Sequence, residues 1–127
     1  ESMYNTPPVF PVYTSLLTLQ WLKNLGGVAA IEKINNEKAA LLYNEIDRNP
    51  LFRGTAAVED RSNMNVTFLL NDEAHKDTFD AMWKAANISG LPGHRSVGGY
   101  RASIYNAMPI ESVQVLVDVM KALEASV

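Results

Sequence analysis

The sequence predicts an α+β domain, in which a small, mostly antiparallel sheet has helices packed on one of its faces. Three observations support this class. Apolar residues recur at helical spacing in long segments at both ends of the chain, apolar and polar residues alternate in short segments between them, and turn residues separate the segments. The 127 residues, 47% of them hydrophobic and 20% charged, have the size and composition of one globular domain.

The first predicted element is a helix over residues 10–25. Pro7 and Pro8 precede it, where a missing N–H group costs little, and Gly26 and Gly27 end it. Its surface is apolar almost all round, so we expect other protein to cover it. Residues 1–27 are therefore predicted to join the domain to a further part of the protein or to a second subunit.

A second helix is predicted over residues 28–48, and Asn49-Pro50 ends it. The spacing predicts a buried stripe of Ile31, Ile34, Leu41, Leu42 and Ile46, and a solvated face that includes Glu32, Lys33, Glu37, Lys38 and Glu45. This helix is therefore expected to pack against the sheet.

Alternation of apolar and polar residues predicts a strand over residues 64–70. A weaker strand is predicted within residues 53–58. Asn71 and Asp72 can cap a third helix over residues 73–87, because their side chains accept hydrogen bonds from free N–H groups of a first turn.

Three elements complete the chain. Residues 89–99 contain four glycines and a proline, and are predicted to form a loop or a short edge strand. Residues 100–105 alternate again, which predicts a strand with Arg101 and Ser103 on one face. Pro109 is predicted to start the last helix.

Composition excludes several classes of protein. The net charge of −3 argues against a general nucleic-acid binder. No apolar run approaches the roughly 20 residues that span a bilayer, and no signal peptide is evident, so no membrane partner is predicted. The absence of cysteine excludes disulfides and thiolate chemistry, and is consistent with a cytoplasmic protein.

The distribution of charge points to an anion site. No carboxylate occurs between Asp80 and Glu111. The basic residues of that stretch are Lys84, His94, Arg95 and Arg101. A stretch that keeps cations without their usual partners is a candidate for anion binding, although a solvated basic loop is the simpler alternative.

Two arginines in this stretch have the chemistry of anion clamps. Arg95 and Arg101 flank a flexible Gly98-Gly99 pair, and each offers a planar fork of donors that matches a carboxylate or a phosphate. Together they can grip the two ends of one dianionic ligand, with His94 as a further donor. The alternative is a surface loop in which Arg101 forms a structural ion pair.

A second candidate anion site precedes the first helix. The amide of Asn5 and the hydroxyl of Thr6 can hold a phosphate beside the free N–H groups of a helix N-terminus. The alternative is that they only cap the helix. No metal site is predicted, since His75 and His94 lack ligand spacing with each other or with a carboxylate.

The sequence resembles a known family. Residues 94–107, His-Arg-Ser-Val-Gly-Gly-Tyr-Arg-Ala-Ser-Ile-Tyr-Asn-Ala, are similar to a signature of phosphoserine aminotransferases. Residues 4–8, Tyr-Asn-Thr-Pro-Pro, are similar to the segment that follows the catalytic lysine of that family. Further matches in the same order are residues 24–27, 38–43 and 61–66. The resemblance covers essentially the whole chain.

The resemblance implies the C-terminal small domain of a homodimeric, fold-type-I enzyme that uses pyridoxal phosphate. Such enzymes transfer an amino group between glutamate and 3-phosphohydroxypyruvate, giving phosphoserine and 2-oxoglutarate in serine biosynthesis. Many bacterial members also act in pyridoxine biosynthesis.

The resemblance also implies a role for each site residue. Asn5 and Thr6 match residues that bind the cofactor phosphate in the neighbouring subunit's site. His94 and Arg95 match residues that bind the substrate's phosphate or distal carboxylate, and Arg101 matches the residue that binds the α-carboxylate.

The lysine that forms the Schiff base in this family lies upstream of the residues that match 4–8. The lysines present lie on predicted helices amid surface-type sequence, namely Lys23, Lys33, Lys38, Lys76, Lys84 and Lys121. No catalytic residue is therefore predicted within the chain, and the fragment alone is expected to be inactive. The alternative is a stand-alone anion-binding module without catalysis, although the apolar first helix favours the enzyme domain.

Overall fold

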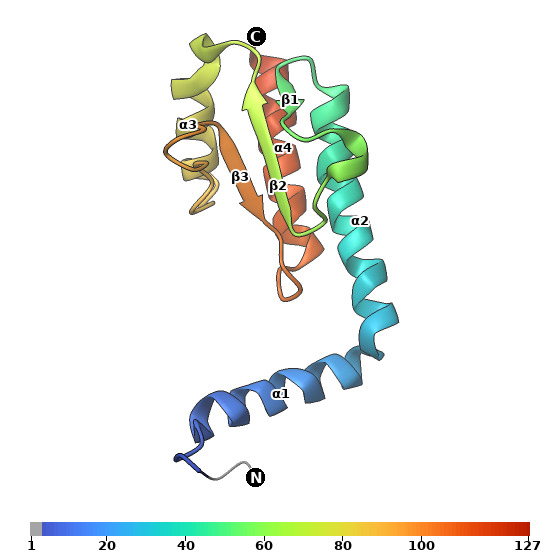
Figure 1. Ribbon diagram of the computed structural model, residues 1–127. Coiled ribbons are helices and arrows are strands. Elements are labelled where there is room, and N and C mark those ends of the chain that lie inside the picture. Colours follow the sequence, from blue (N-terminus) through green and yellow to red (C-terminus); the bar gives the residue numbers. More distant parts are fainter. Residues whose placement is uncertain (1–3) are drawn as a thin grey trace. The chain divides into compact units, whose positions relative to one another are not determined.

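A computed structural model describes residues 4–127, which belong to two compact units, Glu1–Lys33 and Ile34–Val127. The helices are α1 (Val9–Leu25), α2 (Gly27–Arg48), α3 (Lys76–Ala85) and α4 (Ile110–Ser126), with short 3₁₀ helices η1 (Val58–Asp60) and η2 (Glu73–His75). The strands are β1 (Phe52–Gly54), β2 (Asn65–Leu70) and β3 (Tyr100–Ser103) (Figure 1). The predicted α+β class is confirmed.

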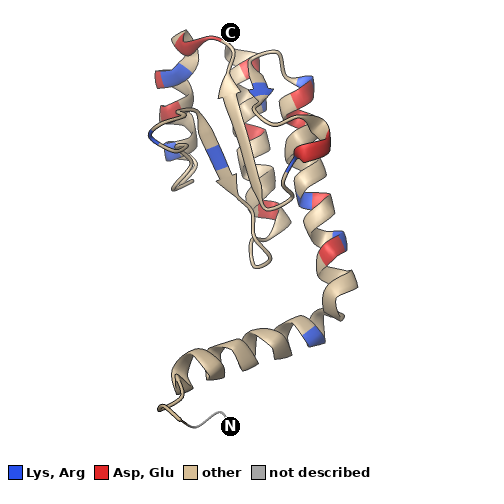
Figure 2. Cartoon of the chain, in the orientation of Figure 1, with Lys and Arg blue, Asp and Glu red and all other residues tan. Residues whose placement is uncertain are grey.

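The first unit contains α1, an apolar helix as predicted. Gly26 ends it in a left-handed conformation, and its N–H donates to the carbonyls of Leu22 and Lys23. Lys23 is the helix's single charged residue (Figure 2). No residue of α1 is buried, so the described residues do not cover its apolar side chains. No helix of residues 4–127 is long and apolar enough to cross a membrane.

The second unit is built on a three-stranded antiparallel sheet in the order β1-β2-β3. Phe52 pairs with Leu70 across β1 and β2, and Thr67 pairs with Arg101 across β2 and β3. Strand β2 is therefore central, with a neighbour on each side.

One face of the sheet forms the core. Alternate residues of β2 are buried, and the buried face meets α2, α3 and α4 (Figure 1). Four aromatic rings, Phe52, Phe68, Phe79 and Tyr100, pack together with centroids 5.0–6.5 Å apart. Large apolar groups of this kind dominate the energy of a core. The other residues of β2, Asn65, Thr67 and Leu69, lie on the opposite face of the sheet.

Helix α2 corrects one prediction. Lys38 and Glu45 were expected on the solvated face, but both are buried, with 0% and 4% exposure. Each charge is satisfied inside the fold. The Lys38 ammonium donates to backbone carbonyls, and the Glu45 carboxylate accepts hydrogen bonds from Arg48 and Asn49. Paired polar groups can be buried where unpaired ones cannot.

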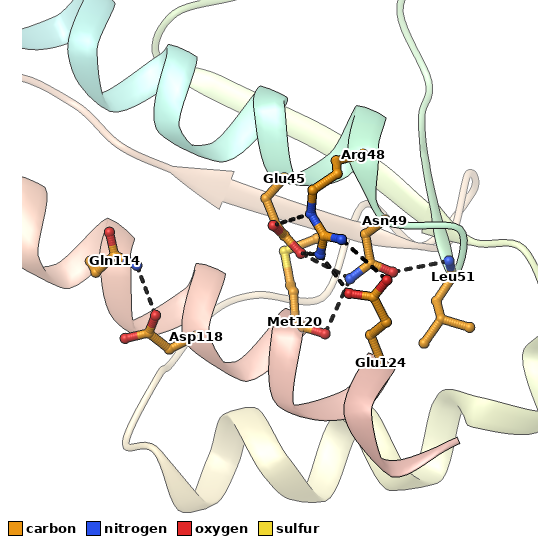
Figure 3. Close-up of polar contacts among 8 residues, drawn as sticks. All are labelled: Glu45, Arg48, Asn49, Leu51, Gln114, Asp118, Met120 and Glu124. Carbon is orange, nitrogen blue, oxygen red and sulfur yellow. Dashed lines mark hydrogen bonds and ion pairs between the residues drawn. The ribbon is translucent and has the colours of Figure 1, made fainter.

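The C-terminal end of α2 is tied to α4 by a polar cluster (Figure 3). The Arg48 guanidinium contacts the carboxylates of Glu45, at 2.7 Å, and Glu124, at 2.5 Å. Asn49 donates to Glu45 and to the carbonyl of Met120, which brings the end of one helix against the last turns of the other. None of these contacts involves a residue of β3, the strand that carries Arg101.

Several predicted boundaries change. The weak strand predicted within residues 53–58 is β1, which spans Phe52–Gly54, and η1 begins at Val58. Residues 73–87 form η2 and then α3, and Asp72 caps the 3₁₀ turn by accepting from the Ala74 N–H. Strand β3 ends at Ser103 rather than at residue 105, where the chain turns toward α4.

Candidate functional site

Arg101 lies on the uncovered face of the sheet, in the middle of β3. Its neighbours Tyr100 and Ala102 are buried, so alternation directs the Arg101 side chain away from the core. Among residues 4–127, no carboxylate lies within ion-pair distance of this guanidinium. The structural ion pair considered above is therefore absent from this part of the chain. The side chain remains able to bind an external anion.

The residue before Arg101 anchors the strand. The Tyr100 hydroxyl donates to the Asp80 carboxylate at 2.9 Å, and the Trp83 indole N–H donates to the same oxygen at 2.9 Å. Lys76 completes this group at 2.5 Å. Burial works to raise the pKa of Asp80, but these three donors outweigh it and hold the pKa below its ordinary value. Asp80 therefore stays ionised and ties β3 to α3.

Residues 93–99 form a tight loop immediately before β3. The Gly93 N–H donates to the Gly99 carbonyl at 2.8 Å, which closes the loop, and the Val97 and Gly98 N–H groups both donate to the His94 carbonyl. The segment before the loop forms one isolated bridge to Tyr100, at Pro92. Residues 89–99, predicted as a loop or a short edge strand, thus contain a loop preceded by a single β-bridge.

Gly99 allows the loop to approach the sheet. Its φ is +65°, and a Cβ built there would meet the Leu69 Cδ2 at 2.3 Å and the Phe68 carbonyl oxygen at 2.8 Å. Only glycine avoids this clash and also adopts a positive φ without strain. The loop can therefore lie directly on β2, which brings His94 toward the sheet face that carries Arg101.

The ring of His94 is oriented within the loop. Its Nδ1 lies 2.8 Å from the Ser96 hydroxyl and accepts a hydrogen bond from the Ser96 backbone N–H at 3.3 Å. A neutral ring that accepts at Nδ1 carries its proton on Nε2. His94 thus retains a ring N–H donor for a ligand.

His94 and Arg101 line one cavity between the loop and the sheet. The cavity has a volume of about 130 Å³, well above the roughly 10–15 Å³ that one water molecule needs. None of its lining residues is acidic. Thr55 and Thr67 add two hydroxyl groups, which lie 2.5 Å apart. Because these hydroxyls are hydrogen-bonded to each other, the donors left for a ligand are chiefly the Arg101 guanidinium and the His94 ring, which suit a carboxylate or a phosphate.

Arg95 is placed differently from the other two basic residues. It lies exposed in the turn that follows His94 and does not line the cavity. In this structure His94, rather than Arg95, shares a cavity with Arg101. The two arginines therefore occupy the loop and the sheet, as two separate groups on either side of Gly98 and Gly99.

Sequence reasoning did not identify Thr55 or Thr67 as site residues. The period of two in residues 64–70 places Thr67 on the polar face, but its neighbour across the sheet depends on register, which the sequence alone leaves open. Once Thr67 is paired with Arg101, the hydroxyl belongs to the same surface as the guanidinium.

Asn5 and Thr6 lie in the first unit, before α1. The N-cap residue of α1 is Pro8, and no side chain caps the helix, so the simple capping alternative for Asn5 and Thr6 is wrong. Both residues are exposed. Two uncommitted polar side chains next to the free N–H groups of a helix start fit the phosphate group of a cofactor.

Comparisons with known proteins agree with one another. The sequence model of the family described as aminotransferase class-V matches residues 1–116. The chain is 80% identical over 127 residues to a phosphoserine aminotransferase of Flavobacterium johnsoniae, covering all of this chain and 36% of that protein. It is 59% identical over 126 residues to the one of Parabacteroides distasonis, covering 98% of this chain and 36% of that protein.

Solved structures give the same result. The phosphoserine aminotransferase of Bacillus circulans subsp. alkalophilus has a TM-score of 0.91 and 43% identity, over 98% of this chain and 35% of that one. A PLP-bound phosphoserine aminotransferase of Trichomonas vaginalis has a TM-score of 0.84 and 41% identity, over 94% and 34%. The chain thus spans about a third of the length of the proteins it matches.

Proposed function

Because the chain belongs to the class-V aminotransferase family, we propose that it is the C-terminal domain of a pyridoxal-phosphate-dependent phosphoserine aminotransferase. The whole enzyme would transfer an amino group between glutamate and 3-phosphohydroxypyruvate, giving phosphoserine and 2-oxoglutarate. The sequence resemblance further implies a cytoplasmic homodimer that acts in serine biosynthesis, with pyridoxine biosynthesis as a second role. Residues 1–27 would join this domain to the large domain that binds the cofactor.

The observation that carries the proposal is Arg101, which has no ion-pair partner among residues 4–127 and shares with His94 a cavity without acidic residues. Both substrates have an α-carboxylate, and one guanidinium can bind a carboxylate through two parallel hydrogen bonds. We assign this carboxylate to Arg101. A fixed strand is a good carrier for such a group, because the position of the bound carboxylate then fixes the orientation of the substrate.

The other end of the substrate differs between the two reactants, since phosphoserine ends in a phosphate and glutamate in a carboxylate. We assign this variable end to His94 and Arg95. The loop presents both residues to solvent, and the two side chains offer different donors, a ring N–H and a planar fork. A loop can adjust to ligands of different length more readily than a strand.

The cofactor would be bound only in part by this chain. We assign its phosphate to Asn5, Thr6 and the first N–H groups of α1, as the exposed side chains and the absence of a side-chain cap allow. When bound, pyridoxal phosphate supplies the electron sink and carries the amino group. The residues of this chain bind and orient its phosphate and the substrate.

Three of the chain's six lysines, Lys38, Lys76 and Lys84, have contacts that do not suit covalent chemistry. Burial lowers the pKa of Lys38, which is a property of reactive lysines. Its ammonium, however, is fully buried and donates to three carbonyls, so no aldehyde can reach it. Lys76 pairs with Asp80, and Lys84 lies over the Trp83 ring. Because the resemblance also places the Schiff-base lysine upstream of the segment that matches residues 4–8, we expect the catalytic lysine of the enzyme to lie outside this chain.

One experiment tests the proposed function. The full-length enzyme and the 127-residue chain are titrated with pyridoxal phosphate and assayed with glutamate and 3-phosphohydroxypyruvate. We expect amino transfer and the visible absorbance of a lysine-bound cofactor from the enzyme, and neither from the chain alone. A full-length protein that binds phosphorylated ligands without amino transfer would support an anion-binding module instead.

A further test addresses the loop. Changing Arg95 to Ala in the full-length enzyme should weaken the binding of phosphoserine more than that of an analogue without the phosphate. The reason is that a charge-assisted hydrogen bond would be lost only with the phosphorylated substrate. Equal losses for both compounds would reject the assignment of Arg95 to the phosphate.

A further inference from the structure

The second unit buries a lysine. Lys38 has 0% exposure, and its ammonium donates hydrogen bonds to the carbonyls of Ile104 at 3.0 Å, Tyr105 at 2.7 Å and Met108 at 3.0 Å. Within residues 4–127 no carboxylate lies within ion-pair distance of it. The charge is therefore balanced by dipoles of the backbone alone.

A buried ammonium of this kind is costly. Burial in a low-dielectric interior disfavours the charged form, which is why the pKa of Lys38 is lowered. The three carbonyls match the three N–H donors of the ammonium, so none is left unpaired. An apolar side chain would fill the same volume without that cost. What the ammonium adds is a fixed position for three carbonyl groups of one turn.

That turn follows directly after β3. Residues 104–108 connect the strand to Pro109 and α4, and the Asn35 side chain donates to Asn106 in the same turn at 2.8 Å. On the other side, the Ile104 N–H donates to the Met64 carbonyl at 2.9 Å. The chain three residues after Arg101 is thus held by α2 on one side and by the segment leading into β2 on the other.

We propose that Lys38 is a positioning residue for Arg101, acting through the end of β3. The strand is anchored before Arg101 by Tyr100 and Asp80, and after it by the Lys38 contacts. With both ends fixed, the guanidinium projects from a strand that cannot slide or fray. The inference rests on the proposed function, because the ligand concerned is the α-carboxylate assigned to Arg101.

The experiment uses the full-length enzyme with Lys38→Met, which keeps an unbranched side chain, one heavy atom shorter, and removes its three donors. Arg48→Met is the matched control, because it breaks the polar cluster at the far end of α2 (Figure 3) without touching the turn after β3. Three quantities are measured for each variant: the thermal unfolding midpoint, the KM values for glutamate and phosphoserine, and the hydrogen exchange of residues 100–104.

We expect Lys38→Met to raise both KM values by on the order of tenfold, because a small displacement of a binding group weakens the bound geometry. The change should fall on KM more than on kcat, since the carboxylate is held before and during the reaction. Exchange of residues 100–104 should become faster. Arg48→Met should lower the unfolding midpoint but leave the KM values and this exchange unchanged.

Other outcomes overturn the proposal. Unchanged KM values in Lys38→Met, or equal increases in Arg48→Met, would make Lys38 a structural residue only. If Lys38→Met does not fold, Asn35→Ala is the second test, since it removes a contact to the same turn. We expect its KM values to rise about threefold, the effect of one hydrogen bond. Unchanged KM values in this variant would contradict the proposal. Unchanged hydrogen exchange of residues 100–104 in Lys38→Met would contradict the positioning role. A wild-type enzyme without amino transfer would instead contradict the proposed function.

Discussion

The Tyr100 hydroxyl donates a hydrogen bond of 2.9 Å to the Asp80 carboxylate and so joins the first residue of β3 to α3. Tyr100 is also part of the aromatic core, stacked on Phe68 with ring centroids 5.3 Å apart. The residue before Arg101 is therefore held by an apolar and a polar contact at once. This relationship makes the strand a stable carrier for the exposed guanidinium.

Replacing Tyr100 by Phe should destabilise the fold by about 1–3 kcal/mol, because the partly buried Asp80 carboxylate would lose one of its donors. The free energy of unfolding measured in urea tests this. Tyr105→Phe is the control, since that hydroxyl is exposed and contacts Asn65 on the surface. Its effect should stay within about 0.5 kcal/mol, and equal losses in both variants would contradict the role of Asp80.

The lowered pKa of Asp80 also predicts that the stability of the fold depends on pH. Its pKa is lower in the folded state than the ordinary 3.8, so ionised Asp80 stabilises the fold at pH values above 3.8. This contribution is lost as the pH falls through the depressed folded value. Asp80→Asn should therefore lower the free energy of unfolding at neutral pH, and the difference from wild type should shrink in acid.

Unfolding curves between neutral pH and about pH 3 measure that difference, in the range where a carboxylate titrates. Asp118→Asn removes one charge from an exposed position on α4 and serves as the control. A difference between wild type and Asp80→Asn that stays constant over the whole range would contradict the depressed pKa.

Gly99 and Gly98 give a comparison of steric and conformational effects. Both have positive φ, +65° and +73°, but only at Gly99 would a Cβ meet other atoms. Gly98→Ala should lower the free energy of unfolding by about 1 kcal/mol, because alanine is disfavoured in the left-handed backbone conformation. Gly99→Ala should cost more, by about 1–3 kcal/mol of overpacking against Leu69 and Phe68. Equal costs in urea unfolding would show that the loop does not lie on β2 as described.

Thr6 is tested by cofactor retention. Thr6→Ala in the full-length enzyme should raise the dissociation constant for pyridoxal phosphate, since one hydroxyl donor to the phosphate would be lost. Ser15→Ala is the control, because the Ser15 hydroxyl donates to the Pro11 carbonyl within α1. An unchanged dissociation constant for Thr6→Ala would reject its assignment to the cofactor.

The order and type of the elements could be predicted because each has a clear period. Residues 64–70 and 100–105 alternate, and the observed β2 and β3 lie within them. The exact end of β3 could not be predicted, since the turn after it accepts hydrogen bonds from Lys38, which is distant in the sequence.

Lys38 shows why the burial prediction failed. It lies four residues after Ile34 and four before Leu42, inside the predicted apolar stripe, but its charge placed it with the solvated residues. Position would have been the better guide. The three carbonyls that make its burial possible are 66–70 residues away in the sequence and have no local signal.

The candidate site could be predicted only as a list of residues. His94 and Arg101 were identified from charge and from the family resemblance, but their shared cavity depends on the close approach of Gly99 to β2. The distance between a loop and a sheet face is set by packing of the whole domain. Thr55 and Thr67 enter the cavity for the same reason.

The most direct test of the central claim is the steady-state kinetics of Arg101→Ala in the full-length enzyme, with Arg53→Ala on β1 as the control. Arg53 is also exposed, but it donates to Asn71 and to the Leu70 carbonyl. We expect Arg101→Ala to lose about 1.5–3 kcal/mol of carboxylate binding for both glutamate and phosphoserine, and Arg53→Ala to lose little. Unchanged KM values for both substrates in Arg101→Ala would contradict the account.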